Sequence, residues 1–114
     1  MPVRGVRRRY LHIIVNSSGQ ITKVQLDETL RRSLLSLFGI KGLSEVDLFL
    51  TNFNEEERRG IVRCNHHGLR TLRAAIAFIT SINAEATVIH VDRVSGTIKR
   101  LKKKTGEIIE KNKT

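Results

Sequence analysis

The sequence contains few of the residues that stabilise secreted proteins or anchor proteins in membranes. Its 114 residues include one cysteine, Cys64, one proline and no tryptophan. A single cysteine excludes an internal disulfide framework and fits a reducing compartment. No apolar run is long enough to span a bilayer. The early run at 13–15 is too short for a signal peptide. We therefore expect a cytoplasmic protein without a membrane segment.

The positive charge of the chain is localised. The formal net charge is +10, and the ten excess basic residues lie in two stretches that contain no acid, whereas the other Lys and Arg residues balance the 11 acids. Localised positive charge attracts a polyanion and releases its counterions. We predict RNA contacts at Arg4, Arg7, Arg8, Arg9, Arg93, Lys99, Arg100, Lys102, Lys103 and Lys104. The alternative is a basic surface that only keeps the protein soluble.

The spacing of apolar residues predicts six secondary-structure elements. The expected strands cover 8–15, 46–53, 59–65 and 86–91, and the expected helices cover 22–39 and 69–82. Thr22 and Gln25 have capping-box spacing at the start of the first helix, and Gly39 is a left-handed cap at its end. Ser95-Gly96 interrupts the last strand as a bulge or a turn, with 97–101 as a candidate extension.

This order of elements is typical of the ferredoxin-like fold. We expect a β-α-β-β-α-β, RRM-like α+β sandwich, with a four-stranded antiparallel sheet and both helices on one face. Alternation places Leu11, Ile13 and Val15 on one face of the first strand. The first and last strands are adjacent and antiparallel in this topology, so the two basic stretches should meet at one edge. Hydrophobic residues make up 39% of the chain, which is enough for one core. We therefore expect a single RNA-binding domain over 1–105 and a polar tail over 106–114.

Two functions common to this fold fit the sequence poorly. RNA-recognition motifs stack bases on aromatic residues of the first and third strands, but the third strand reads Arg59-Gly60-Ile61-Val62-Arg63-Cys64. Acylphosphatase-like enzymes need a phosphate-cradling loop with an arginine after the first strand, and loop 16–20 has no cation. Contacts to the phosphates of structured RNA fit better.

One short segment carries residues that bind metals or act as nucleophiles. Cys64, His66 and His67 lie together, but structural zinc usually needs four ligands in paired spacing. A cysteine nucleophile needs a positioned histidine and an orienting acid. We interpret Cys64 as a small core residue and the histidines as part of a turn. We therefore expect no catalytic residue, no metal and no cofactor bound by the protein.

Several segments in order resemble a known family. They are Arg9-Tyr10-Leu11, Leu37-Phe38-Gly39, Gly42-Leu43, Ile61-Val62-Arg63-Cys64, an apolar helix near 74–82, and Ser95-Gly96-Thr97-Ile98-Lys99-Arg100. Together they resemble the small ribonuclease P protein subunit shared by archaea and eukaryotes, the Pop-five type. The most specific part is the structural motif Ser95, Gly96, Thr97 and Ile98, where we expect Gly96 to need a backbone geometry that alanine resists. The short chain looks like the archaeal form.

The resemblance implies a role in removing the 5′ leader of precursor tRNA. It implies that the large RNA subunit performs the hydrolysis with Mg²⁺, and that the protein helps this RNA hold its active shape. The implied partners are ribonuclease P RNA, precursor tRNA, a TIM-barrel-like protein subunit, and a second copy of this chain as a homodimer within a heterotetramer. The alternatives are a ribosomal or other RNA-scaffold protein and a small-molecule-binding regulatory domain.

Overall fold

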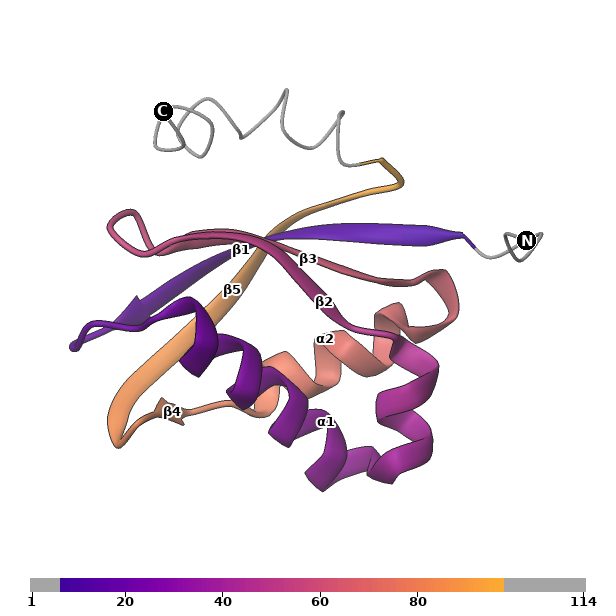
Figure 1. Ribbon diagram of the computed structural model, residues 1–114, viewed down its shortest axis with the longest axis horizontal. Coiled ribbons are helices and arrows are strands. Elements are labelled where there is room, and N and C mark those ends of the chain that lie inside the picture. The colour runs from indigo at the N-terminus through magenta and orange to yellow at the C-terminus, as the bar shows by residue number, and fades with distance from the viewer. Residues whose placement is uncertain (1–6, 98–114) are drawn as a thin grey trace.

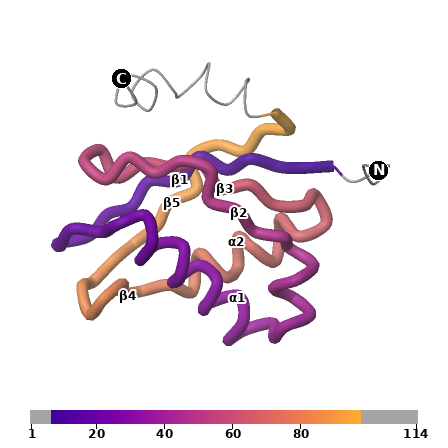
Figure 2. The backbone as a smooth tube through the Cα atoms, in the orientation of Figure 1, coloured from indigo at the N-terminus to yellow at the C-terminus, as the bar shows by residue number. Residues whose placement is uncertain are grey.

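Two helices pack against one side of an antiparallel sheet in the computed structural model of the chain (Figure 1). The structure describes residues 7–97. Its elements are β1 (Arg8–Ser17), α1 (Lys23–Val46), β2 (Phe49–Asn54), β3 (Arg59–Asn65), the 3₁₀ turn η1 (His66–Gly68), α2 (Leu69–Phe78), β4 (Ser81–Ile82) and β5 (Glu85–Ser95). Figure 2 follows the backbone through both helices, which lie on the same side of the strands. The boundary expected at residue 105 lies outside the described residues.

The sheet has five strands, in the order β2-β3-β1-β5-β4. The mixed α/β architecture with an antiparallel sheet is confirmed, but the expectation of four strands was wrong. We predicted 79–82 as the end of the second helix because Ile76, Ile79 and Ile82 follow helical spacing. Instead α2 ends at Phe78, and Ile79 has an extended backbone (φ −77°, ψ 120°). Asn83 and Ala84 both have positive φ, as a two-residue hairpin turn requires, so β4 pairs with the start of β5.

The core lies between the sheet and the helices. Leu11, Ile13 and Val15 are buried on the helix side of β1, which confirms the predicted alternation. They are packed in one cluster with leucines of α1 and with Leu72 and Ile76 of α2. Among residues 7–97, both helices lie on this side of the sheet, and the opposite face carries none of them.

Helix α1 begins as predicted and ends later than predicted. The Thr22 hydroxyl accepts from the Gln25 amide at 3.1 Å, and the Gln25 side chain accepts from the Thr22 amide at 3.1 Å. Gly39 breaks the helix with φ 74°, but the helix resumes and reaches Val46. There Asp47 takes a left-handed conformation and its amide donates to the Leu43 carbonyl. The expected strand start at residue 46 was therefore wrong, because Val46 packs in the core as the last helical residue.

Strand β5 contains its irregularity earlier than the sequence suggested. The register with β1 shifts between His12 and Ile13, which pair with Arg93 and Val91, so Asp92 is the extra residue of a bulge. The strand itself runs to Ser95 and ends there. Thr97 is not in the strand, and the rest of the candidate extension at 98–101 lies outside the described residues.

Candidate nucleic-acid interface

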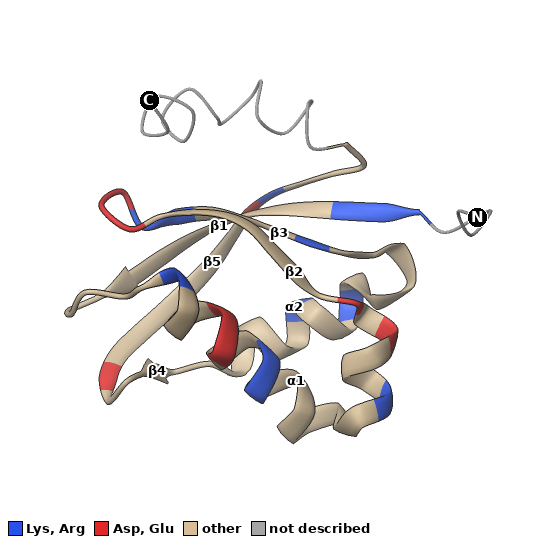
Figure 3. Ribbon diagram, viewed as in Figure 1, with Lys and Arg blue, Asp and Glu red and all other residues tan. Residues whose placement is uncertain are grey.

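The start of β1 lies beside the end of β5. Tyr10 pairs with Ser95 and Leu11 pairs with Val94, so the antiparallel adjacency predicted for the first and last strands is confirmed. Arg9 reaches across this edge, since a side chain at position 96 would meet its Nη1 at 3.6 Å. Figure 3 shows basic residues at the start of β1 and again on β5. We call this end of the paired strands β1 and β5, where Arg7, Arg8 and Arg9 lie, the basic edge of the domain.

The predicted RNA-contact residues within the described range are all at least partly exposed. Arg7 and Arg93 are exposed, and Arg8 and Arg9 are half-buried. Arg8 Nη1 lies 3.6 Å from an Asp47 carboxylate oxygen, and Arg9 Nη1 donates to the Arg8 carbonyl at 3.0 Å. The remaining predicted contacts lie outside the described residues: Arg4, Lys99, Arg100, Lys102, Lys103 and Lys104.

The structure corrects the role expected for Gly96. The backbone of Gly96 does not adopt a positive φ, and the Arg9 guanidinium nitrogen at 3.6 Å is an ordinary contact for a new methyl group. Ser95 closes a local turn by accepting from the Thr97 amide at 3.2 Å. Alanine therefore fits at position 96. Ile98, the last residue of the predicted motif, lies outside the described residues.

The sheet face opposite the helices is rich in arginine. We call it the open face, and its basic side chains at paired positions are Arg8 on β1, Arg59 and Arg63 on β3, and Arg93 on β5. Among the described strand residues of this face, Asp92 is the one acid. The sequence argument missed Arg59 and Arg63 because the acids at 55–57 balance their charge along the chain. Their alternation with Gly60, Val62 and Cys64 was the available signal.

His12 lies at the centre of the open face and is fully buried. Its Nδ1 is 3.0 Å from an Asp92 carboxylate oxygen, and its Nε2 has no hydrogen-bond partner. Burial lowers the pKa of His12, and the positive charges of Arg59 and Arg93 lower it further, whereas Asp92 opposes the shift. The ring is therefore neutral at neutral pH. Because a carboxylate only accepts, Nδ1 carries the proton and Nε2 is an acceptor.

This environment predicts a pH-dependent stability. The folded state holds His12 at a pKa below the ordinary value of 6.5, so it binds that proton less tightly than the unfolded chain. We expect the free energy of unfolding to decrease as the pH falls from about 7 to about 5. Urea unfolding across this range measures the effect. His12→Gln should flatten the dependence, whereas the same change at exposed His66 should leave most of it; equal slopes in all three proteins would contradict the assignment.

Cys64 is a core residue, as predicted. Its side chain is fully buried in the main cluster, and burial raises the pKa of its thiol to about 11 although Arg9 opposes this. The thiol is therefore not activated as a nucleophile. His66 and His67 are exposed in η1 with ring centroids 5.5 Å apart. Across residues 7–97, no three His, Cys, Asp or Glu side chains are grouped so that they could hold a metal.

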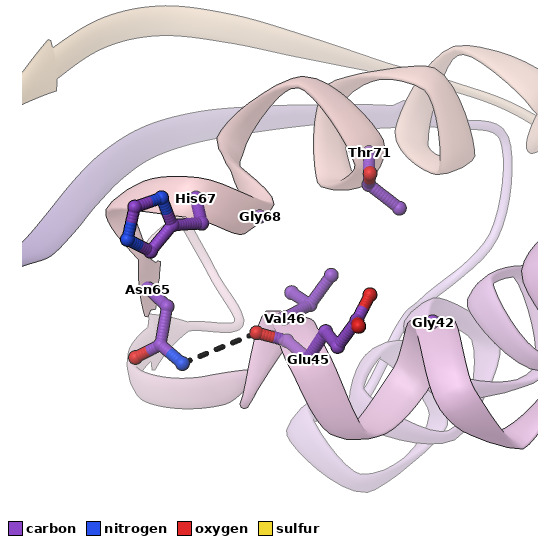
Figure 4. Close-up of a pocket in the computed structure, with 7 residues that line it drawn as sticks. All are labelled: Gly42, Glu45, Val46, Asn65, His67, Gly68 and Thr71. Carbon is purple, nitrogen blue, oxygen red and sulfur yellow. Dashed lines mark hydrogen bonds between the residues drawn. The ribbon is translucent and has the colours of Figure 1, made fainter. Parts of the chain in front are cut away.

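A pocket of about 450 Å³ lies between the end of α1 and the start of α2. Figure 4 shows its lining residues: Gly42, Glu45, Val46, Asn65, His67, Gly68 and Thr71. Asn65 Nδ2 donates to the Glu45 carbonyl at 3.1 Å, which ties the end of β3 to α1. The pocket thus lies at a structural junction and offers a single carboxylate.

Within residues 7–97, no helix is long and apolar enough to cross a membrane.

Comparisons with known proteins identify one family by sequence and a similar fold in one solved structure. The model of the Rpp14/Pop5 family matches residues 9–105. Ribonuclease P protein component 2 of Pyrococcus horikoshii is 35% identical over 98 residues, which cover 86% of this chain and 82% of the relative. The Methanosarcina barkeri protein of the same name is 33% identical over 104 residues, 91% of this chain and 76% of the relative. A chain in the cryo-EM structure of yeast ribonuclease MRP has a similar fold, with a TM-score of 0.66, 15% identity and 98% of each chain covered.

Proposed function

Because the chain belongs to the Rpp14/Pop5 family, we propose that its basic edge binds the RNA of ribonuclease P and helps that RNA cleave the 5′ leader from precursor tRNA. The chain is a protein subunit of ribonuclease P, a ribonucleoprotein that processes RNA. Its own contribution is to neutralise phosphates where segments of the RNA approach one another. Neutralised phosphates release counterions, and this favours compact RNA.

One observation carries the proposal. The arginines that precede Tyr10 lie beside the end of β5, because Tyr10 pairs with Ser95. Arg7, Arg8 and Arg9 thus lie at this edge, and in the sequence the basic stretch 99–104 follows the end of β5. Cations gathered at one place on a protein suit a polyanion better than scattered charge does.

The chemistry is proposed to belong to the RNA and its Mg²⁺ ions. Magnesium prefers carboxylate oxygens and phosphates, and residues 7–97 bring no three such side chains together. We therefore propose that the Mg²⁺ ions are held by the RNA and its phosphates. We propose that the protein holds the ribonuclease P RNA. It contacts the substrate, precursor tRNA, when that substrate is bound in the same particle.

Protein partners are proposed to bind near the break in α1. Leu35, Leu37, Phe38 and Ile40 surround Gly39, and the exposed fraction of Ile40 is 78%. Apolar side chains gathered in this way support a protein contact. The partners we propose are a TIM-barrel-like ribonuclease P subunit and a second copy of this chain, as a homodimer within a heterotetramer. The particle is proposed to be cytoplasmic.

The test is a tagged pull-down from the source cell. We expect one large structured RNA to be bound, and the eluate to remove the 5′ leader of precursor tRNA in the presence of Mg²⁺. The control for RNA contact through the basic edge is a tagged variant in which Arg7, Arg8 and Arg9 are replaced by glutamine. Recovery of ribosomal RNA without cleavage would favour an RNA-scaffold protein, and recovery of no RNA would contradict both assignments.

A further inference from the structure

The open face of the sheet carries polar groups that the basic edge does not explain. We propose that this face is a second RNA-contact surface, on which Arg59 and Arg93 hold phosphates and His12 Nε2 accepts a hydrogen bond from a ribose 2′-hydroxyl. This inference rests on the proposed RNA-binding function. It adds a site on the opposite side of the sheet from the helices, and a contact that distinguishes RNA from DNA.

The charge of the open face suits a nucleic-acid backbone. Arg93 pairs directly with His12 on one side of β1, and Arg59 pairs with Ile14 on the other side. Both positive charges act on the His12 ring. Arginine binds phosphate oxygens with a planar fork of donors. Asp92 offsets part of this charge, because its carboxylate lies 3.9 Å from Arg93 Nε and 3.0 Å from the neutral His12 ring. Arg59 and Arg63 on β3 keep the net charge of the open face positive.

The His12 ring is held in the tautomer whose Nε2 atom accepts a hydrogen bond. Its hydrogen bond to Asp92 assigns the proton to Nδ1, which leaves the lone pair of Nε2 without a partner although the side chain is fully buried. Arg63 Nε on the neighbouring strand is also buried without a partner. Unsatisfied buried polar atoms are uncommon and destabilising. A phosphate cannot donate to Nε2, whereas a ribose hydroxyl can.

The aromatic residues of the face favour backbone recognition over base stacking. The Phe49 ring is covered by the Arg63 guanidinium, whose carbon lies 4.8 Å from the ring centroid. Tyr10 on β1 is half-buried. One face of Phe49 is thus occupied by an arginine, and Tyr10 is partly covered, so this face lacks the pair of free rings that stack bases in RNA-recognition motifs. Because His12 is fully buried in the unbound chain, a contact at Nε2 requires the groups that cover it to move aside.

The first test changes the ligand and not the protein. Binding of the full chain to a short fluorescein-labelled RNA strand is compared with binding to the DNA strand of the same sequence, by anisotropy. We expect RNA to bind about fivefold more tightly, the change that one net hydrogen bond of ordinary strength produces. Equal affinity for the two strands would overturn the 2′-hydroxyl contact while leaving the proposed function intact.

Paired variants then separate His12 from the arginines. Asparagine at position 12 can still donate to Asp92 but has no atom at the Nε2 position, whereas glutamine places an acceptor there. We expect His12→Asn to abolish the preference for RNA over DNA, and His12→Gln to keep part of it, with thermal melting as the check of folding. If both variants retain the full preference, the proposal is wrong.

The phosphate contacts have a charge-matched control. Arg59→Gln and Arg93→Gln should weaken RNA and DNA binding equally, and each should reduce the log–log salt slope by about 0.7. Arg73→Gln removes the same charge from the exposed surface of α2, on the other side of the sheet, and should change the slope little. Equal effects of all three substitutions would overturn the open-face site. A wild-type chain that binds no RNA would overturn the proposed function as well.

Discussion

Replacing Arg7, Arg8 and Arg9 together with glutamine is expected to weaken binding to ribonuclease P RNA about a hundredfold at about 0.15 M salt. Each arginine that contacts a phosphate releases about one counterion, so the log–log slope of affinity against salt should fall by about 2 to 3. The measurement is a filter-binding titration of the RNA at several salt concentrations. The loss should shrink as the salt concentration rises.

The control for this prediction removes the same charge elsewhere. Arg32, Arg70 and Arg73 are exposed on the two helices, and their triple substitution by glutamine leaves the edge intact. Folding should survive the edge variant, because Arg8 and Asp47 form a partly exposed ion pair of small energy. If both triple variants lose affinity equally, the chain binds RNA through its net charge and not through this edge.

Gly60→Ala is expected to lower the free energy of unfolding by about 1–3 kcal/mol, because it overpacks the contact between β2 and β3. A methyl group at position 60 would lie 2.6 Å from the Asn52 carbonyl oxygen and 3.1 Å from the Phe53 ring. The carbonyl belongs to the backbone of the paired strand, so it cannot rotate away. Urea unfolding followed by circular dichroism measures the change.

The same substitution at Gly96 is the matched control. There the new methyl group meets only the end of the Arg9 side chain, at 3.6 Å. We expect the free energy of unfolding to stay within about 0.5 kcal/mol of the original. Equal destabilisation at the two positions would show that the close approach at Gly60 is not what makes glycine necessary there.

Local patterns predicted the elements whose signals do not depend on distant residues. The alternation of apolar residues in β1 and the capping box of α1 depend only on residues close together in the sequence. The structure confirms both. Strand β4 was missed because Ile79 and Ile82 keep helical spacing, whereas positive φ at Asn83 and Ala84 decides the turn. The later end of α1 was missed because a glycine break resembles a helix end in sequence. Packing of Val46 in the core settles that question, and packing is not visible in the sequence.

The candidate site was predictable only as far as charge is counted along the chain. That count found the arginines at 7–9 and Arg93, which have no acids nearby in sequence. It passed over Arg59 and Arg63, because pairing of β3 with β1 moves them away from the acidic hairpin and onto the open face. His12 is neutral, so counting charged residues along the sequence does not identify it. Its significance comes from Asp92, eighty residues later, which only the bulge in β5 brings to its ring.

The central position of β1 has a consequence for how the protein is made. Both neighbours of β1 come later in the chain, and its contact with β5 joins Tyr10 to Ser95. Contacts of such long range form slowly, because a large loop must close before they contribute stability. Strand β1 therefore pairs with β5 only after β5 has been synthesised. Arg7, Arg8 and Arg9 come to lie beside the end of β5 only when the sheet has formed. RNA that recognises this arrangement binds the folded chain alone, so its presence stabilises the protein by mass action.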